Sequence, residues 1–127
     1  MNVDELLAQA RSRLERLSPQ AAREAMEGGA VLVDIRAESQ RAAGGVVPGS
    51  VYIPRNVLEW RADPTSESHD ERIPEGARVI LICGQGYQSS LAAATLRYLG
   101  VDATDVEGGF QAWRDAGLAV EQGPLER

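Results

Sequence analysis

Two short apolar runs place the strongest constraint on how this chain can fold. Residues 30–35 (A-V-L-V-D-I) and 78–82 (R-V-I-L-I) are almost entirely aliphatic, and each leads to a polar or reactive side chain, Asp34 in the first run and Cys83 after the second. A strand without polar alternation is buried on both faces, as in a parallel sheet covered by helices. We therefore predict such a sheet, with Asp34 and Cys83 at strand ends.

Helical patterns precede, separate and follow these runs. Apolar residues recur at helical spacing from Val3 to Leu17, which predicts one amphipathic helix over that span. Ser18 and Pro19 are typical of a helix start, and the glycines at 28 and 29 end this second helix. The other expected elements are strands over residues 50–53 and 103–106 and helices over residues 92–99 and 110–116. The alternation predicts an α/β domain whose ligand site lies beyond the carboxyl ends of the strands.

Composition excludes several classes of protein. The chain has 127 residues with one cysteine and one histidine, too few for a disulfide scaffold, a zinc site or an iron–sulfur cluster. Its formal net charge of −6 is opposite in sign to that of a nucleic-acid-binding surface. All 13 basic residues are arginines, which excludes Schiff-base chemistry on lysine and a lysine-dependent phosphate loop. We expect one domain, with no metal, no cofactor and no nucleic-acid partner.

The beginning of the chain carries no export or membrane pattern. Asp4 and Glu5 stand where a secretion signal has positive charge, and no apolar run approaches about 18 residues. We therefore expect a cytoplasmic protein with a reduced thiol and no membrane partner.

A polar stretch over residues 59–75 interrupts the alternation of strands and helices. It holds six acidic residues, two prolines and the histidine, His69, so we predict a long surface connection in which His69 is solvated. We expect the two tryptophans, Trp60 and Trp113, in or near the core.

The segment C-G-Q-G-Y-Q-S, residues 83–89, carries the clearest chemical pattern. It joins an apolar strand to a helix start, and Gly84 and Gly86 allow its amide N–H groups to turn toward one atom. The helix N-terminus adds partial positive charge, which favours a thiolate. We predict that Cys83 is a nucleophile, rather than the small buried hydrophobic residue that a lone cysteine more often is.

Four motifs, in this order, resemble those of single-domain rhodaneses, the sulfurtransferases that carry sulfur as a cysteine persulfide. They are D-I-R at residues 34–36, similar to Asp-x-Arg; G-V-V-P-G-S at residues 45–50, similar to Gly-His-Ile-Pro-Gly-Ala; the loop at residues 83–89, similar to Cys-x-x-Gly-x-Arg-Ser; and G-G-F-Q-A-W at residues 108–113, similar to Gly-Gly-x-x-x-Trp. The resemblance implies a three-layer α/β domain, with a central parallel sheet flanked by helices, over residues 18–127. Residues 1–17 then form an N-terminal helical extension that packs either on the domain or on another subunit, as in a homodimer.

The resemblance also implies a two-step reaction. The Cys83 thiolate takes sulfane sulfur from a donor such as thiosulfate, and an external thiol, cyanide or an acceptor protein then removes it. The residues implied to bind the substrate are Gly84, Gln85, Gly86, Tyr87, Gln88 and Ser89, and those implied to orient the loop are Asp34 and Arg36. Tyr87 either lines the mouth of the site or covers apolar surface.

Departures from the family pattern concern the sulfur donor. Gln88 stands where the family has an arginine, so the loop lacks the positive charge that would hold an anion. The turn at residues 45–50 also lacks the histidine of the family pattern. Either Arg55 or Arg61 supplies the charge from another direction, or both arginines are solvated and paired with neighbouring acidic residues.

The loop argues against two other cysteine chemistries and leaves one alternative open. A cysteine phosphatase needs an arginine six residues after its cysteine, where Ser89 stands, and a dithiol oxidoreductase needs a second cysteine in place of Gly86. The open alternative is a rhodanese-like binding or regulatory module with weak turnover, assembled through the N-terminal helix. Persulfide formation on Cys83 distinguishes the enzyme from this module.

Overall fold

Four parallel strands form the central sheet in the computed structural model, which describes residues 1–124. Along the chain they are β1 (Val31–Asp34), β2 (Val51–Tyr52), β3 (Arg78–Ile82) and β4 (Asp102–Asp105), and across the sheet their order is β2-β1-β3-β4. The two apolar runs are therefore the central strands, and they pair with each other along their length. This architecture confirms the α/β fold with a parallel sheet that the sequence predicts.

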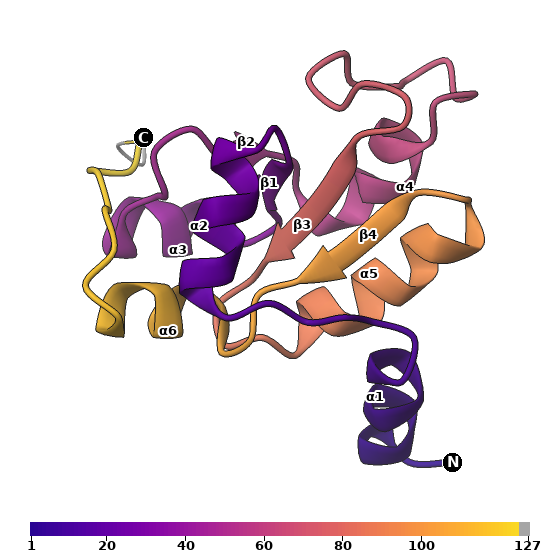
Figure 1. Ribbon diagram of the computed structural model, residues 1–127, viewed down its shortest axis with the longest axis horizontal. Coiled ribbons are helices and arrows are strands. Elements are labelled where there is room, and N and C mark those ends of the chain that lie inside the picture. Colours follow the sequence, from indigo (N-terminus) through magenta and orange to yellow (C-terminus); the bar gives the residue numbers. More distant parts are fainter. Residues whose placement is uncertain (125–127) are drawn as a thin grey trace.

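Helices cover both faces of the sheet and complete three layers (Figure 1). One face is covered by α2 (Pro19–Glu27) and α6 (Gly109–Asp115), and the other by α4 (Leu58–Ala62) and α5 (Gln88–Tyr98). Outside these layers are α3 (Glu38–Gly44), which lies next to α6, and a 3-10 turn, η1 (Arg55–Val57), which leads into α4. α1 (Val3–Arg11) packs on α5, so the N-terminal helix contacts its own domain.

Neighbouring residues of the central strands face opposite layers of the core. Leu32 and Ile80 pack with Trp113 against α2 and α6, whereas Val33 and Leu81 pack against α4 and α5. These strand residues are at most 1% exposed. Because both faces are covered, the strands are apolar at every inner position, which explains why the two runs show no polar alternation.

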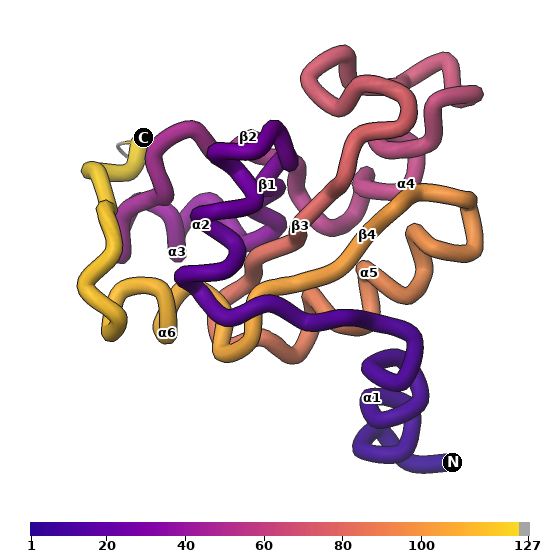
Figure 2. The backbone as a smooth tube through the Cα atoms, in the orientation of Figure 1, coloured from indigo at the N-terminus to yellow at the C-terminus, as the bar shows by residue number. Residues whose placement is uncertain are grey.

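The first helix is shorter than its apolar pattern predicts. α1 ends at Arg11, and residues 12–17 form a turn and an extended segment. The N–H of Leu17 donates to the Asp105 carbonyl at 3.0 Å, and its own carbonyl accepts from the Glu107 N–H at 2.8 Å. These bonds satisfy the edge of β4, which outweighs the helical preference of the segment, and Figure 2 shows this indigo segment running beside β4.

The polar stretch over residues 59–75 is also more structured than the sequence predicts, because α4 occupies its beginning. Leu58 and Ala62 are one helical turn apart and both are buried, so Trp60, between them, faces solvent and is 60% exposed. The expectation that Trp60 lies in or near the core is therefore wrong. Trp113, by contrast, is buried as expected.

The helices of residues 1–124 are short, and α5 is the longest of them at 11 residues. None of these helices combines the length and the apolar character needed to cross a membrane. The apolar stripe of α5, which includes Ala92 and Leu96, packs against the sheet instead.

Two leucines test whether the central strands carry the core. Leu81 in β3 is fully buried, whereas Leu99 at the end of α5 is 43% exposed. Leu81→Ala should lower the free energy of unfolding by about 2–5 kcal/mol, because it removes buried surface and leaves a cavity. Leu99→Ala, the control, should change it by less than about 1 kcal/mol. Both values can be measured by urea denaturation, and equal losses in the two variants would contradict this assignment of the core.

Candidate active site

Cys83 directly follows β3, at the carboxyl edge of the sheet. Residues 83–87 form a loop, and α5 begins at Gln88. The loop reverses direction at Gly86, whose φ of +86° is strained for a residue with a Cβ. This turn brings later amides of the loop back to the sulfur of its first residue.

Two backbone N–H groups donate hydrogen bonds to the Cys83 sulfur. The Gly86 nitrogen is 3.2 Å and the Ser89 nitrogen 3.3 Å from Cys83 Sγ. Hydrogen bonds to a charged acceptor are stronger than those to a neutral one, so converging amides stabilise a thiolate more than a thiol. The loop therefore has the geometry that its two glycines lead us to expect.

A cavity of about 580 Å³ has Cys83 in its wall. The loop residues that share this lining are Gly84, Gln85, Tyr87 and Gln88. Gly86 and Ser89 contact the sulfur through their N–H groups instead. Tyr87 is 59% exposed, which places its ring at the mouth of the cavity. Of the six loop residues that the resemblance singles out, two thus contact the sulfur and four share the cavity lining with Cys83.

Asp34 and Arg36 form a buried ion pair at the end of β1. Arg36 Nη2 lies 2.9 Å from Asp34 Oδ2 and also donates to the Gly45 carbonyl at 2.7 Å. The guanidinium carbon lies 3.9 Å from the centre of the Phe110 ring in α6. Arg36 lines the cavity, but its guanidinium is engaged by these neighbours, as a residue that orients the surrounding backbone requires.

Arg41 and Tyr52 extend this ion pair away from the cavity. Arg41 Nε is 3.3 Å from Asp34 Oδ2, and its guanidinium carbon lies 3.9 Å from the centre of the Tyr52 ring. Burial raises the pKa of Tyr52, and the nearby Glu38 carboxylate raises it further, so the phenol is neutral at pH 7. Asp34 therefore has two arginine partners, and its negative charge is compensated before a substrate enters.

Asp105 is a residue of this site that the sequence reasoning missed. It is fully buried at the end of β4, and its Oδ2 accepts hydrogen bonds from Ser89 Oγ at 2.7 Å and Ser90 Oγ at 2.8 Å. Arg16 Nε donates to its Oδ1 at 2.9 Å. Asp105 thus fixes the start of α5, which carries one of the amides that contact Cys83. Its strand, D-A-T-D, is half polar, so Asp105 does not end an apolar run as Asp34 does, and the signal that singles out Asp34 is weaker here.

The two candidate anion-binding arginines lie in different places. Arg55, in η1, lines the cavity beside Cys83, and its Nη1 lies 2.7 Å from a Glu59 carboxylate oxygen. Its Nε is buried and has no hydrogen-bond partner within residues 1–124. Arg61, in α4, is not part of the cavity lining, and its Nη1 donates to the Ser68 carbonyl at 3.4 Å. Of the two arginines, the fold brings only Arg55 to the cavity that Cys83 lines.

Comparison with known proteins identifies the family. The Rhodanese-like domain matches residues 18–116, most of the chain. The chain belongs to the rhodanese-like family. The match includes all four motifs on which the sequence resemblance rests, and it ends before the C-terminal residues.

Named relatives of this rhodanese indicate its class of enzyme. The thiosulfate sulfurtransferase GlpE of Ectopseudomonas mendocina is 35% identical over 106 residues, which cover 81% of this chain and 87% of that protein. A solved structure of a protein of unknown function from Rhodopseudomonas palustris, named as a possible tyrosine phosphatase, is 34% identical, with a TM-score of 0.87 over 95% of both chains. The thiosulfate sulfurtransferase of Pseudomonas aeruginosa is 26% identical, with a TM-score of 0.71 over 87% of this chain and 20% of that chain. The rhodanese is a sulfurtransferase, as the sequence predicts.

Two glycines test the loop of this rhodanese. A Cβ on Gly86 would lie 2.8 Å from the backbone nitrogen of Gly108. Gly86→Ala should therefore lower the free energy of unfolding by at least about 1–2 kcal/mol, because strain at positive φ adds to this clash. A Cβ on Gly84 would meet only the flexible end of Gln40, at 3.3 Å, so Gly84→Ala should keep nearly the wild-type stability in urea denaturation. A Gly86→Ala variant as stable as the Gly84→Ala variant would show that the loop does not need its left-handed turn.

Proposed function

We propose that this rhodanese carries sulfane sulfur as a persulfide on Cys83, from an anionic donor such as thiosulfate to a thiol, cyanide or an acceptor protein. One observation carries the proposal. Cys83 Sγ, in the wall of an open cavity, accepts hydrogen bonds from two backbone N–H groups, whose nitrogens lie 3.2 and 3.3 Å away. These N–H groups favour the thiolate that must attack, and they are in place before the sulfur donor binds.

The first step exchanges one sulfur–sulfur bond for another. The Cys83 thiolate attacks the outer sulfur of thiosulfate and forms an Sγ–S bond. The original bond of thiosulfate breaks, and sulfite leaves with the bonding electron pair. The loop amides then face a sulfur chain whose terminal atom carries negative charge, so the same dipoles that favour the thiolate also favour the persulfide.

The second step returns the enzyme to its starting state. A nucleophilic acceptor, such as a thiolate or cyanide, attacks the outer sulfur, and Cys83 leaves as a thiolate. Cys83 is the only cysteine of the chain, so no neighbouring thiol of this chain can resolve the persulfide. The acceptor must therefore come from outside and reach the sulfur through the cavity.

The composition of the loop favours sulfur over phosphate as the transferred group. A thiolate that attacks a phosphate ester needs an arginine in the loop to bind the phosphoryl oxygens. Positions 88 and 89 hold glutamine and serine here, and the Ser89 hydroxyl donates to Asp105 rather than to the cavity. A single sulfur atom needs only the amide donors that the loop supplies.

Arg55 supports the choice of an anionic donor. Its side chain is 28% exposed and lines the cavity, and its one ion pair within the described part of the chain, with Glu59, uses Nη1. The guanidinium of Arg36, by contrast, is already bound to Asp34 and to the Gly45 carbonyl. Arg55 is thus the cation best able to bind the sulfonate oxygens of thiosulfate.

Cys83→Ser tests the nucleophile. The variant should lose persulfide formation and sulfur transfer with little change in the free energy of unfolding, because the substitution is nearly isosteric. After incubation with thiosulfate, mass spectrometry should find one added sulfur atom on the wild-type peptide that contains Cys83 and none on the variant. Cyanide should remove this sulfur as thiocyanate. A wild-type Cys83 that gains no sulfur from any sulfane donor would favour the binding-module alternative.

Arg55→Met tests the recognition of the donor. The loss of a charge-assisted hydrogen bond should lower kcat/KM for thiosulfate about tenfold or more. Arg61→Met removes the same charge outside the cavity and should keep the wild-type value. Because Arg55→Met also frees Glu59 to repel an anion, the double variant with Glu59→Gln should show the loss due to Arg55 alone. Equal kcat/KM values for the Arg55→Met and Arg61→Met variants would rule out Arg55 as the anion-binding residue.

A further inference from the structure

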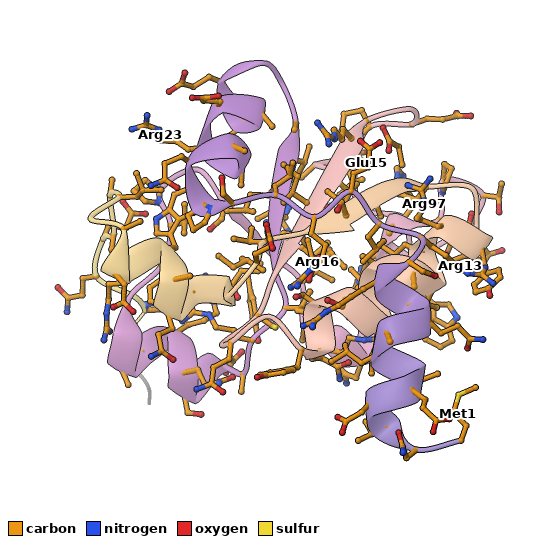
Figure 3. The ribbon with its side chains drawn as sticks, turned by 60° about the horizontal axis from the view of Figure 1, so that its bottom comes forward. Met1, Arg13, Glu15, Arg16, Arg23 and Arg97 are labelled. Carbon is orange, nitrogen blue, oxygen red and sulfur yellow. The ribbon has the colours of Figure 1, made fainter. Side chains whose placement is uncertain are left out.

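Two arginines before the family match contact the cysteine loop. The match begins at residue 18, whereas Arg11 ends α1 and Arg16 lies in the extended segment that follows. Both side chains donate to the Gly86 carbonyl, Arg11 Nη2 at 2.8 Å and Arg16 Nη2 at 3.0 Å. Figure 3 shows Arg16 extending toward the middle of the molecule, whereas Arg13 lies at its outer side. The two arginines therefore hold the glycine whose N–H donates to Cys83 Sγ.

Each arginine is held in place by a second contact. Arg11 Nε donates to Ser90 Oγ at 3.1 Å, and the Ser90 hydroxyl donates to the buried Asp105 carboxylate at 2.8 Å. Arg16 contacts both oxygens of Asp105, at 2.9 and 3.2 Å, and its side chain is only 16% exposed. The Gly86 carbonyl is therefore bound by two cations that are themselves anchored to β4 and α5.

Peptide geometry connects this carbonyl to the interior of the loop. In a trans peptide unit, the C=O of one residue and the N–H of the next point in opposite directions, and residues 1–124 contain no cis peptide bond. Holding the Gly86 carbonyl against the arginines therefore turns the Tyr87 N–H to the other side of the loop. In the sequence, Tyr87 and Gln88 lie between Gly86 and Ser89, the two residues whose N–H groups donate to Sγ. They also stand at the start of α5, and the first N–H groups of a helix have no acceptor within that helix.

We propose that Arg11 and Arg16 are positioning residues for sulfur transfer. By fixing the Gly86 carbonyl, they hold the loop amides in the orientation that receives the thiolate and then the outer sulfur of the persulfide. Their positive charge also lies against the loop backbone. The loop itself has no cation, because Gln88 stands where the resemblance to rhodaneses implies an arginine. This role rests on the proposed function of Cys83, and it makes residues 1–17 part of the catalytic unit rather than an appendage.

Arg13 provides a matched control. It lies between Arg11 and Arg16 in the sequence and carries the same charge, but its guanidinium lies over the Tyr98 ring, 4.7 Å from the ring centre. Tyr98 is at the far end of α5 from the cysteine loop. Arg13→Met therefore changes the net charge and the length of the side chain in the same way as Arg11→Met, and it leaves the Gly86 carbonyl bound.

The test compares Arg11→Met with Arg13→Met in single-turnover formation of the persulfide from thiosulfate. Arg11→Met should lower the maximal rate about tenfold, the effect of one charge-assisted hydrogen bond. The thiosulfate concentration at half-maximal rate should change less than about twofold, because Arg11 does not line the cavity. Arg13→Met should match the wild type. Arg11→Lys keeps a charged donor for the Gly86 carbonyl but cannot also make the Nε contact with Ser90, so it should restore only part of the rate.

Alkylation by neutral iodoacetamide gives a second readout that does not depend on sulfur transfer. The chain has one cysteine, so the reaction reports Cys83 alone, and it should be slower in Arg11→Met and Arg16→Met than in Arg13→Met. Urea denaturation gives the folded fraction by which each rate is divided, since Arg16→Met also removes a partner of Asp105. Unchanged rates per folded molecule in both Arg11→Met and Arg16→Met would overturn the proposal. If the wild type forms no persulfide, the proposed function fails, and the alkylation rates still decide the positioning role.

Discussion

Two buried carboxylates, Asp34 and Asp105, determine how the walls around Cys83 are built. They end β1 and β4, the strands on either side of β3, and neither residue is more than 1% exposed. A carboxylate that is removed from water must be paired and hydrogen-bonded to remain charged. This requirement brings arginines and serine hydroxyls to the carboxyl edge of the sheet, from neighbouring residues for Asp34 and from distant parts of the chain for Asp105.

The two carboxylates organise different sides of the site. Asp34 holds Arg36, and through it the turn that follows α3, on the cavity side. Asp105 holds Arg16 and the Ser89 hydroxyl at the start of α5. Removing one partner of a buried ion pair typically costs about 3–5 kcal/mol, so neither side can rearrange cheaply. The amide N–H groups are consequently fixed before any sulfur donor binds. Dipoles that are oriented in advance in this way contribute most to catalysis.

The sequence predicts those parts of the site whose position follows from the residues next to them in the chain. Cys83 and Asp34 follow or end runs that are apolar throughout, so their position at the end of a buried strand could be predicted from those runs alone. Asp105 ends a strand that is half polar, D-A-T-D, and a helical pattern assigns Arg11 and Arg16 to a solvated face. Arg11 and Arg16 contact Gly86 across 75 and 70 residues of sequence, and partners so far apart leave no local pattern.

The positive charges near the cysteine loop come from outside it, and the loop itself holds Gln88 where the resemblance to rhodaneses implies an arginine. Arg55 faces the cavity from η1, whereas Arg11 and Arg16 contact the loop backbone from the N-terminal segment. In the proposed function, a guanidinium in the cavity acts on an anion that enters, while one bound to a loop carbonyl acts on the sulfur throughout the cycle. An arginine within the loop would couple these two effects, because it would lie beside both the donor and the sulfur. With separate sources, a change at Arg55 is expected to alter the choice of sulfur donor and to leave unchanged the two N–H groups that donate to Cys83 Sγ.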